Sequence, residues 1–151
     1  MRIVIAGAGS VGRYMAQQLG QAGHAVELID NDPSVVSRVK SADLPFRVVL
    51  GDACEVETLA SAGVRTADVV AAVTGDDEDN LVISLLAKQE FGVPRVVGRV
   101  NNPSNEWMFN QMWGVDVSVS TPHLLTALVE EAVTVGAFVR LLSFEHGRSQ
   151  L

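Results

Sequence analysis

The stretch RIVIAGAGSVG (residues 2–12), continued by a helical run and then by VELID (residues 26–30), decides the fold of this chain. An apolar strand leads into a glycine loop, the loop begins a helix, and a second strand ends on an acidic residue. This order is typical of a dinucleotide-binding βαβ unit. It predicts an α/β fold with a Rossmann-like doubly wound parallel sheet and a nucleotide at the glycine loop.

Three glycines of the loop each have a physical role. Gly7 permits the tight turn that leaves the strand, and Gly12 lets the helix pack close to that strand. Gly9 lets the backbone approach a pyrophosphate, because a Cβ atom there would collide with the ligand. The helix then presents unpaired N–H groups and the positive end of its dipole to the phosphates. The loop is therefore a candidate phosphate-binding site.

An acidic residue, Asp30, lies at the end of the second strand, roughly twenty residues past the loop. A carboxylate there accepts hydrogen bonds from a ribose diol. An arginine at the next positions would favour a 2′-phosphate, but Asn31 and Asp32 follow, so we disfavour NADP. The fingerprint predicts an adenine nucleotide. The alternative is a Rossmann domain that has lost its ligand.

Composition restricts the class of protein. The 151 residues fit one domain, and no apolar run approaches the roughly 20 residues of a membrane span. We expect no signal peptide, because the sequence enters a strand at once. The single cysteine excludes a disulfide framework and a cysteine-based metal cluster. The net charge of −7 argues against nucleic acid and against direct binding to anionic lipid. We expect a cytoplasmic protein without direct membrane insertion.

Apolar spacing along the chain predicts about six strands separated by helices. The third strand, 46–50, is apolar enough to be buried, whereas the alternating stretch 115–120 predicts a half-exposed edge strand. The expected strands are 2–6, 26–30, 46–50, 68–73, 95–100 and 115–120. The expected helices are 11–22, 33–39, 55–62, 80–91 and 102–113.

Two of these helices carry apolar residues that we expect to be covered. On the first helix the inward positions at helical spacing are Val11, Met15, Leu19 and Ala22. On the 102–113 helix the density of aromatic residues and methionine indicates core or an interface. Its residues are Trp107, Met108, Phe109, Met112 and Trp113.

Further candidate residues follow the carboxyl ends of the expected strands, where ligands bind in open α/β sheets. Thr74 and Gly75 follow the strand 68–73, which we expect beside the first strand at the topological switch point. The acidic run after them complements a helix dipole, and Asn80 is its member expected to face the site. Arg99, near the end of the fifth strand, is either a surface charge or a phosphate clamp.

The loop after the third strand offers another candidate, Asp52. Together with Glu55 it matches a capping box, in which Asp52 caps the next helix. The same residue can line the adenine side of the site, because this loop lies beside the Asp30 loop in a doubly wound fold. Both roles can hold at once.

The final apolar run, 121–142, covers most of the circumference of a helix. A helix at the surface of a domain needs only one apolar stripe to pack on that domain. The remaining apolar surface of this helix must therefore be buried against another partner, and a second copy of the chain is the simplest candidate. We predict a homodimer whose contact includes Leu128, Ala132, Val135 and Phe138. The chain then divides into a nucleotide-binding domain, 1–120, and a dimerisation helix with its tail, 121–151.

Together, these motifs resemble the RCK/KTN (TrkA N-terminal) family, the nucleotide-binding domains of Trk- and Ktr-type potassium uptake systems and of gated potassium channels. The resemblance covers nearly the whole chain and is more specific than the glycine loop alone. The segments that carry it are GAGSVG (7–12), GH (23–24), ID (29–30), GDA (51–53), LASAGV (59–64), DEDN (77–80) and GRVNNP (98–103).

The resemblance implies a cytoplasmic regulatory subunit, peripheral at the inner face of the membrane through its partner. It would bind NAD(H) or ATP/ADP, assemble as dimers or higher rings, and act on a membrane potassium transporter or channel through dimer rearrangement. The segment 121–142 looks like the family's crossover helix. The residues that the resemblance assigns to the nucleotide are Gly7, Ala8, Gly9, Ser10, Val11, Gly12, Asp30, Asn31, Asp52, Ala53, Thr74, Gly75, Asn80 and Arg99.

Two features depart from that family. Members usually continue into a C-terminal ligand-sensing domain, so we expect this chain to be an N-terminal portion or one half of a split system. Ktr-type members carry an arginine at the position of Ser10 that reaches the terminal phosphate of ATP. Because this chain has serine in place of that arginine, NAD(H) and ADP are candidate ligands on the same footing as ATP.

An NAD-dependent oxidoreductase, or its isolated cofactor-binding domain, is the alternative. It would need an acid or base near the nicotinamide. Tyr14 has no lysine at a catalytic spacing, Lys40 and Lys88 lie on expected helices, and His123 lies at the expected start of a helix. We therefore expect a protein that is not an enzyme. A third hypothesis is that the protein is a dimerisation scaffold that binds no ligand.

Overall fold

The computed structural model describes residues 1–149, without the side chains at 137, 138 and 141–149. It divides into two compact units, Met1–Ser120 and Thr121–Leu151. The strands of the first unit are β1 (Arg2–Ala6), β2 (Ala25–Asp30), β3 (Arg47–Leu50), β4 (Val69–Ala72), β5 (Arg95–Val100) and β6 (Val117–Ser120). The α-helices are α1 (Ser10–Gln21), α2 (Pro33–Lys40), α3 (Val56–Ser61), α4 (Asp77–Gln89) and α5 (Thr121–Ser149).

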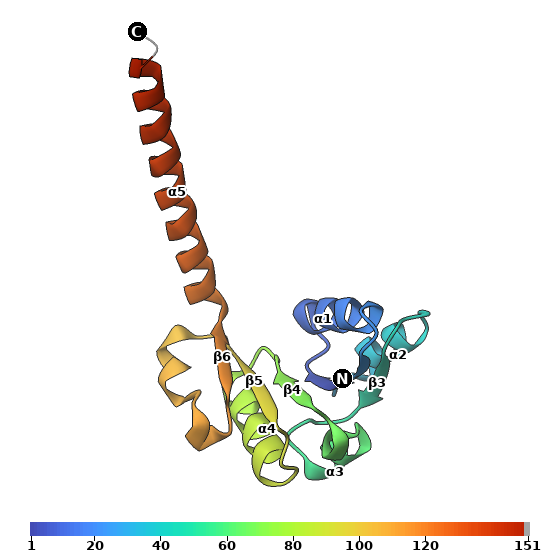
Figure 1. Cartoon of the computed structure of the whole chain (residues 1–151). Coiled ribbons are helices and arrows are strands. Elements are labelled where there is room, and N and C mark those ends of the chain that lie inside the picture. The colour runs from blue at the N-terminus through green and yellow to red at the C-terminus, as the bar shows by residue number, and fades with distance from the viewer. Residues whose placement is uncertain (150–151) are drawn as a thin grey trace. The chain divides into compact units, whose positions relative to one another are not determined.

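The six strands form one parallel sheet in the order β3-β2-β1-β4-β5-β6 (Figure 1). The order in which strands are added to the sheet reverses at β1, which pairs with β2 on one side and with β4 on the other. Ala6 is level with Ile29 and with Ala72, so the three strands end together beside the glycine loop. The predicted Rossmann-like sheet and its switch point are confirmed.

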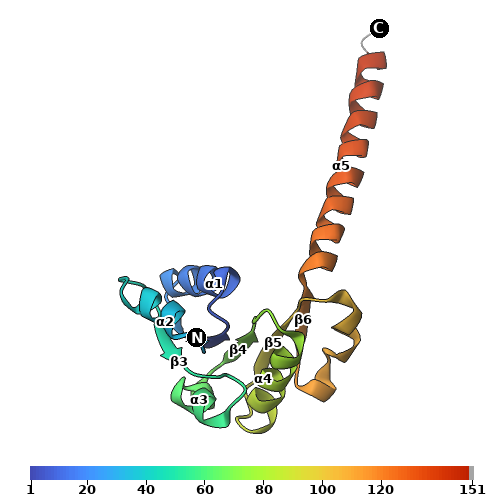
Figure 2. The same ribbon diagram turned by 180° about the vertical axis from the view of Figure 1, so that it is seen from behind.

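Helices cover both faces of the sheet. Figure 2 shows α1 and α2 on one face and α3 and α4 on the other. Under α1 and α2 the core includes Ile5, Ala16 and Leu28, and under α3 and α4 it includes Leu59 and Ile83. Fully burying a large apolar side chain contributes roughly 1.5–3 kcal/mol, so these two layers hold the strand ends in place.

Close contact between α1 and the sheet corrects part of the expected inward face of that helix, because Met15 and Leu19 pack against the core as expected but Val11 and Ala22 do not. Gly12 and Ala16 are its buried residues, while Val11 is 42% exposed and Ala22 is also exposed. A Cβ atom on Gly12 would lie 1.7 Å from the carbonyl oxygen of Gly7, so only glycine fits there. Small residues therefore face the sheet at the start of the helix, and Val11 is free to border the site.

Two further expectations differ from the structure. β3 is an edge strand and is half-exposed, with Leu50 at 50%, because no strand among residues 1–149 pairs with its outer side. The segment 102–113 forms two 3-10 helices, Pro103–Met108 and Gln111–Trp113, in place of one α-helix. The side chain of Asn110 accepts from the Met112 amide and begins a new turn. Phe109 is buried, but Trp107 and Met112 are exposed.

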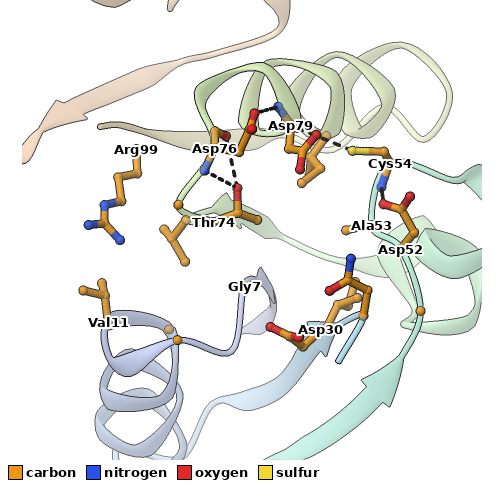
Figure 3. Close-up of a pocket in the computed structure, with 18 of the residues that line it drawn as sticks. Gly7, Val11, Asp30, Asp52, Ala53, Cys54, Thr74, Asp76, Asp79 and Arg99 are labelled. Carbon is orange, nitrogen blue, oxygen red and sulfur yellow. Dashed lines mark hydrogen bonds between the residues drawn. The ribbon is translucent and has the colours of Figure 1, made fainter. Parts of the chain in front are cut away.

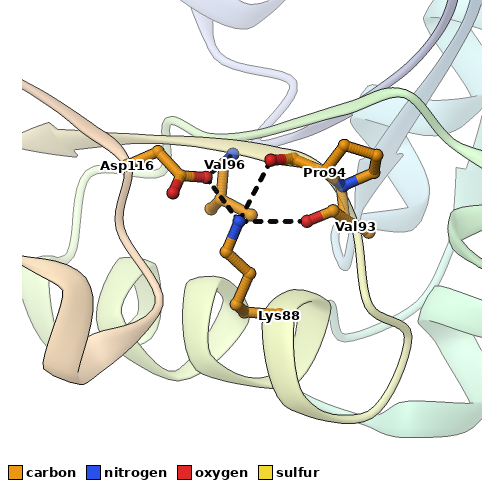
Figure 4. A network of polar contacts seen from close by, with 5 residues as sticks. All are labelled: Lys88, Val93, Pro94, Val96 and Asp116. Atoms are coloured by element: carbon orange, nitrogen blue, oxygen red, sulfur yellow. Dashed lines mark hydrogen bonds and ion pairs between the residues drawn. The ribbon is translucent and has the colours of Figure 1, made fainter.

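One ion pair fixes the far end of α4 to the sheet (Figure 4). Lys88 Nζ lies 2.6 Å from Asp116 Oδ2 and also donates to the carbonyls of Val93 and Pro94, each at 3.1 Å. The same Asp116 oxygen accepts from the Val96 amide at 2.7 Å. Burial acts to raise the pKa of Asp116, but hydrogen bonds from Lys88 and Val96 outweigh it and hold that pKa below its usual range.

Substitution of Lys88 by methionine should lower the free energy of unfolding by about 1–3 kcal/mol, because Asp116 loses its cation and two carbonyls lose a donor. Since the folded pKa of Asp116 is depressed, its stabilisation is present above an unfolded pKa of about 3.9 and is lost as pH falls through the folded value. Urea unfolding at pH 7 and at about pH 3 measures both effects. Lys40→Met, at an exposed lysine, is the control. Equal stability of the two variants at pH 7 would contradict the assignment.

Candidate functional site

A cavity of about 540 Å³ opens at the carboxyl ends of the central strands (Figure 3). It lies where the chain order reverses, the position at which open α/β sheets bind ligands. The predicted site residues that line it are Gly7, Gly9, Ser10, Val11, Gly12, Asp30, Asn31, Asp52, Ala53, Thr74, Gly75 and Arg99.

The glycine loop forms one wall. Gly7 has a φ of +117°, and its amide donates to the carbonyl of Ile29 at 2.8 Å, which ties the loop to β2. A Cβ atom on Gly9 would meet no protein atom within 4 Å, so this position is open on the protein side. Gly9 precedes α1 and makes no side-chain cap. The first amides of α1 therefore lack intrahelical partners and are available to an anion.

Asp30 is held in place from two sides. Its Oδ2 accepts from the Ala8 amide at 2.9 Å, and its Oδ1 accepts from the Asp32 amide at 2.8 Å. Each carboxylate oxygen has a second lone pair, so further hydrogen bonds are available toward the cavity. Ala8 itself is only 1% exposed and lies behind the wall, where its amide orients Asp30. It is absent from the cavity lining, which corrects its expected contact with the ligand.

The turn after β3 forms the opposite end of the cavity. Asp52 Oδ1 accepts from the Cys54 amide at 2.9 Å, so Asp52 closes a turn. The capping box is wrong, because α3 begins after Glu55 without a side-chain cap. Burial raises the pKa of the Cys54 thiol to about 12, with Asp79 and Asp52 adding to the effect. A protonated thiol is a poor nucleophile and metal ligand.

Thr74 lies in the wall formed by the loop after β4, but its hydroxyl is engaged within the protein. The hydroxyl lies 2.7 Å from Asn80 Oδ1 and 3.1 Å from the Asp76 carbonyl, and it accepts from the Asp76 amide at 3.2 Å. Asn80 is fully buried and does not line the cavity, so the expectation that it faces the site is wrong. Asn80 instead forms hydrogen bonds with Thr74 and Arg99, which do line the cavity. Asp76 and Asp79 line the cavity in its place.

Arg99 lines the cavity at the side of the glycine loop, where its guanidinium points toward Val11 (Figure 3). Its Nε is a buried side-chain nitrogen without a hydrogen-bond partner, the one such side-chain atom in the part of the chain that the structure describes. An unsatisfied buried donor costs roughly 1–3 kcal/mol or more when charged. Arg99 is half-buried and lines the cavity, where its guanidinium can pair with a bound anion, so the geometry favours a clamp over a surface charge.

Several lining residues were missed by the sequence analysis. They are Ile29, Gly51, Cys54, Val73, Asp76, Asp79 and Ile83. Cys54 and Asp76 follow strand ends, and their position after an apolar strand is a signal that could have found them. Ile83 comes from the second turn of α4, and its place in the wall depends on packing that no local pattern encodes.

Comparison with known proteins identifies relatives of this chain. The TrkA-N domain model matches residues 3–121. The Trk system potassium uptake protein TrkA of Mycobacterium tuberculosis (strain ATCC 25618 / H37Rv) is 51% identical over 151 residues, which span all of this chain and 68% of that protein.

Two solved structures have the same fold. GsuK bound to ADP has a TM-score of 0.72 at 29% identity, covering 85% of this chain and 32% of that one. The GsuK channel bound to NAD has a TM-score of 0.70 at 19% identity, covering 78% of this chain and 21% of that one. The second likeness concerns the fold alone. Because the family model matches most of the chain and a relative 51% identical covers all of it, the chain belongs to the TrkA-N domain family.

Proposed function

We propose that this chain binds an adenine nucleotide, NAD(H) or ATP/ADP, and thereby regulates potassium uptake by a membrane transporter or channel. The observation that carries the proposal is the half-buried Arg99, which lines a cavity whose other wall is an open glycine loop. The loop amides and Arg99 would hold the phosphates. Asp30 would hold the ribose, and the turn at Asp52 and Ala53 would border the adenine.

The relatives support both the ligand class and the process. GsuK has been solved with ADP and with NAD, and the M. tuberculosis relative is named for potassium uptake. No helix among residues 1–149 combines the length and the apolar character needed to cross a bilayer. A membrane effect would therefore pass through an integral-membrane potassium transporter or channel, with this chain at the cytoplasmic face.

The role that we propose is not catalytic. Cys54 lines the cavity, but its pKa of about 12 keeps the thiol protonated at neutral pH. The remaining ionisable side chains of the lining are aspartates and Arg99. A sensor needs only different affinities for the nucleotide in two states of an assembly. We propose a homodimer as that assembly, joined through α5.

Asp30→Ala should weaken binding of ADP and NADH by about 1–3 kcal/mol, because a charge-assisted hydrogen bond to the ribose is lost. The Ala8 amide also loses its acceptor, so part of the loss reflects a less ordered loop. Isothermal titration calorimetry measures the effect, and a thermal melt checks the fold. Asp43→Ala, at an exposed acid outside the cavity lining, should bind normally. Unchanged affinity of Asp30→Ala for every adenine nucleotide would remove the ribose assignment.

Regulation itself is tested in membrane vesicles that contain the cognate potassium transporter. Addition of the protein should make the rate of potassium uptake depend on ADP or NADH. The Asp30→Ala protein should require a higher nucleotide concentration for the same change. Uptake that is equally fast with and without nucleotide, at concentrations that saturate the protein, would contradict a regulatory role.

A further inference from the structure

One buried side chain, that of Asn80, joins the carboxyl ends of β4 and β5. Its Oδ1 accepts from the amide of Thr74 at 3.0 Å and from the hydroxyl of Thr74 at 2.7 Å. Its Nδ2 donates to the carbonyls of Thr74 at 3.1 Å and of Arg99 at 3.0 Å. An asparagine amide offers two acceptor and two donor positions, so all four are used.

Both residues that Asn80 contacts line the cavity, although Asn80 does not. Thr74 and Arg99 lie at the ends of neighbouring parallel strands, in which Ala72 is level with Gly98. The bond to the Arg99 carbonyl fixes the backbone from which its guanidinium extends. The Nε of Arg99 is buried, which confines the side chain, so the position of its backbone sets where the guanidinium lies.

A second side chain of α4, the acid Asp77, reinforces this connection. Asp77, which is 8% exposed, accepts from the amides of Asn101 at 2.6 Å and Asn102 at 2.9 Å. Asn101 Nδ2 donates to the Thr74 carbonyl at 3.0 Å. The beginning of α4 therefore holds the chain at Arg99 and directly after it, and Asn80 is the member that bonds Arg99 directly.

We propose that Asn80 is a positioning residue, which aims the Arg99 guanidinium at the phosphates of the bound nucleotide. This inference rests on the proposed nucleotide site and adds to it the residue that sets the geometry of the clamp. A guanidinium binds a phosphate well only when both N–H groups meet the oxygens in the right orientation. Without the Asn80 amide, the Arg99 carbonyl loses a buried donor and the end of β5 is free to shift.

A double-mutant cycle tests this role. Asn80→Ala, Arg99→Met and the double variant are titrated with ADP and with NADH by calorimetry. If Asn80 acts through Arg99, Asn80→Ala should weaken binding about tenfold in the presence of Arg99, the effect of about one charge-assisted hydrogen bond. In the Arg99→Met background the same change should have little further effect.

A merely structural role would give a different pattern. Equal weakening by Asn80→Ala in both backgrounds, or no weakening in either, would overturn the positioning role while binding by the unsubstituted protein leaves the proposed function standing. Failure of the unsubstituted protein to bind ADP, ATP, NAD or NADH would remove the proposed function, and the positioning role with it.

Two further variants serve as a control and as a replacement in this test. Ser84 is also fully buried on α4, and its hydroxyl donates to the Asn80 carbonyl at 2.7 Å. Ser84→Ala removes a buried hydrogen bond from the same helix without touching the Asn80 amide, so its nucleotide affinity should match that of the unsubstituted protein. If Asn80→Ala does not fold, Asn80→Ser replaces it in the cycle. Its hydroxyl can bond the Asp76 carbonyl, which already accepts from the backbone amide of residue 80.

Discussion

Gly9→Val should abolish binding of ADP and NADH and leave the fold intact. A Cβ atom at Gly9 meets no protein atom within 4 Å, and the residue has an extended backbone with φ −68° and ψ −174° that valine also adopts. The added side chain would occupy the space in which the pyrophosphate must approach the backbone. Calorimetry should show no binding at nucleotide concentrations that saturate the unsubstituted protein, while circular dichroism stays native.

The matched control is Gly12→Ala, in the same loop. Its Cβ would lie 1.7 Å from the Gly7 carbonyl oxygen, so this smaller change should damage the fold itself. The pair separates a glycine that the proposed ligand requires from one that the packing requires. Normal nucleotide binding by Gly9→Val would show that the loop has only a structural role.

The combination of Leu128→Asp and Val135→Asp should convert a dimer into a monomer. Leu128 is 52% exposed and Val135 is 54% exposed within the chain, on a helix that also leaves Leu124, Leu125 and Val129 half-exposed. Covering apolar surface stabilises by about 25 cal/mol per Å², so a second copy gains from covering this helix. Phe138, which is also predicted from the sequence to lie in the contact, is outside the described side chains.

Light scattering at high micromolar concentration measures the state of assembly. The unsubstituted protein should be a dimer, and the doubly substituted protein a monomer that still binds ADP with near-normal affinity. Thr134→Asp adds a charge to the same helix at an exposed polar position and should leave the dimer intact. An unsubstituted protein that is monomeric with and without nucleotide would contradict the proposed assembly.

Local patterns predicted the parts of this molecule that local chemistry decides. The glycine loop, Asp30 and the order of the strands follow from turn geometry and apolar spacing, and all are found where they were expected. The cap of α2 is another locally determined feature, because Asp32 lies directly before Pro33 and accepts from the Ser34 amide. Such features depend on residues that are neighbours in the sequence.

Features that depend on distant residues were harder to predict. Asn80 was expected to face the site because it follows a strand end, but its side chain turns to the carbonyl of Arg99, nineteen residues away. Val11 was expected to be buried because it fits helical spacing, but Gly12 and Ala16 lie against the sheet together with the predicted Met15 and Leu19, and Val11 is left exposed. In both cases the local sequence is compatible with more than one orientation of the side chain. Contacts with residues distant in the sequence determine which orientation the protein adopts.

The central claim, that the cavity at the glycine loop binds an adenine nucleotide, is tested most directly by calorimetric titration. The protein is first denatured and refolded so that any bound nucleotide is released and removed, and it is then titrated with ADP, ATP, NAD and NADH. We expect saturable binding of at least one of them to a single site on each chain, and its loss in Gly9→Val. Absence of binding for all four nucleotides, by a protein with a native circular dichroism spectrum, would contradict the claim.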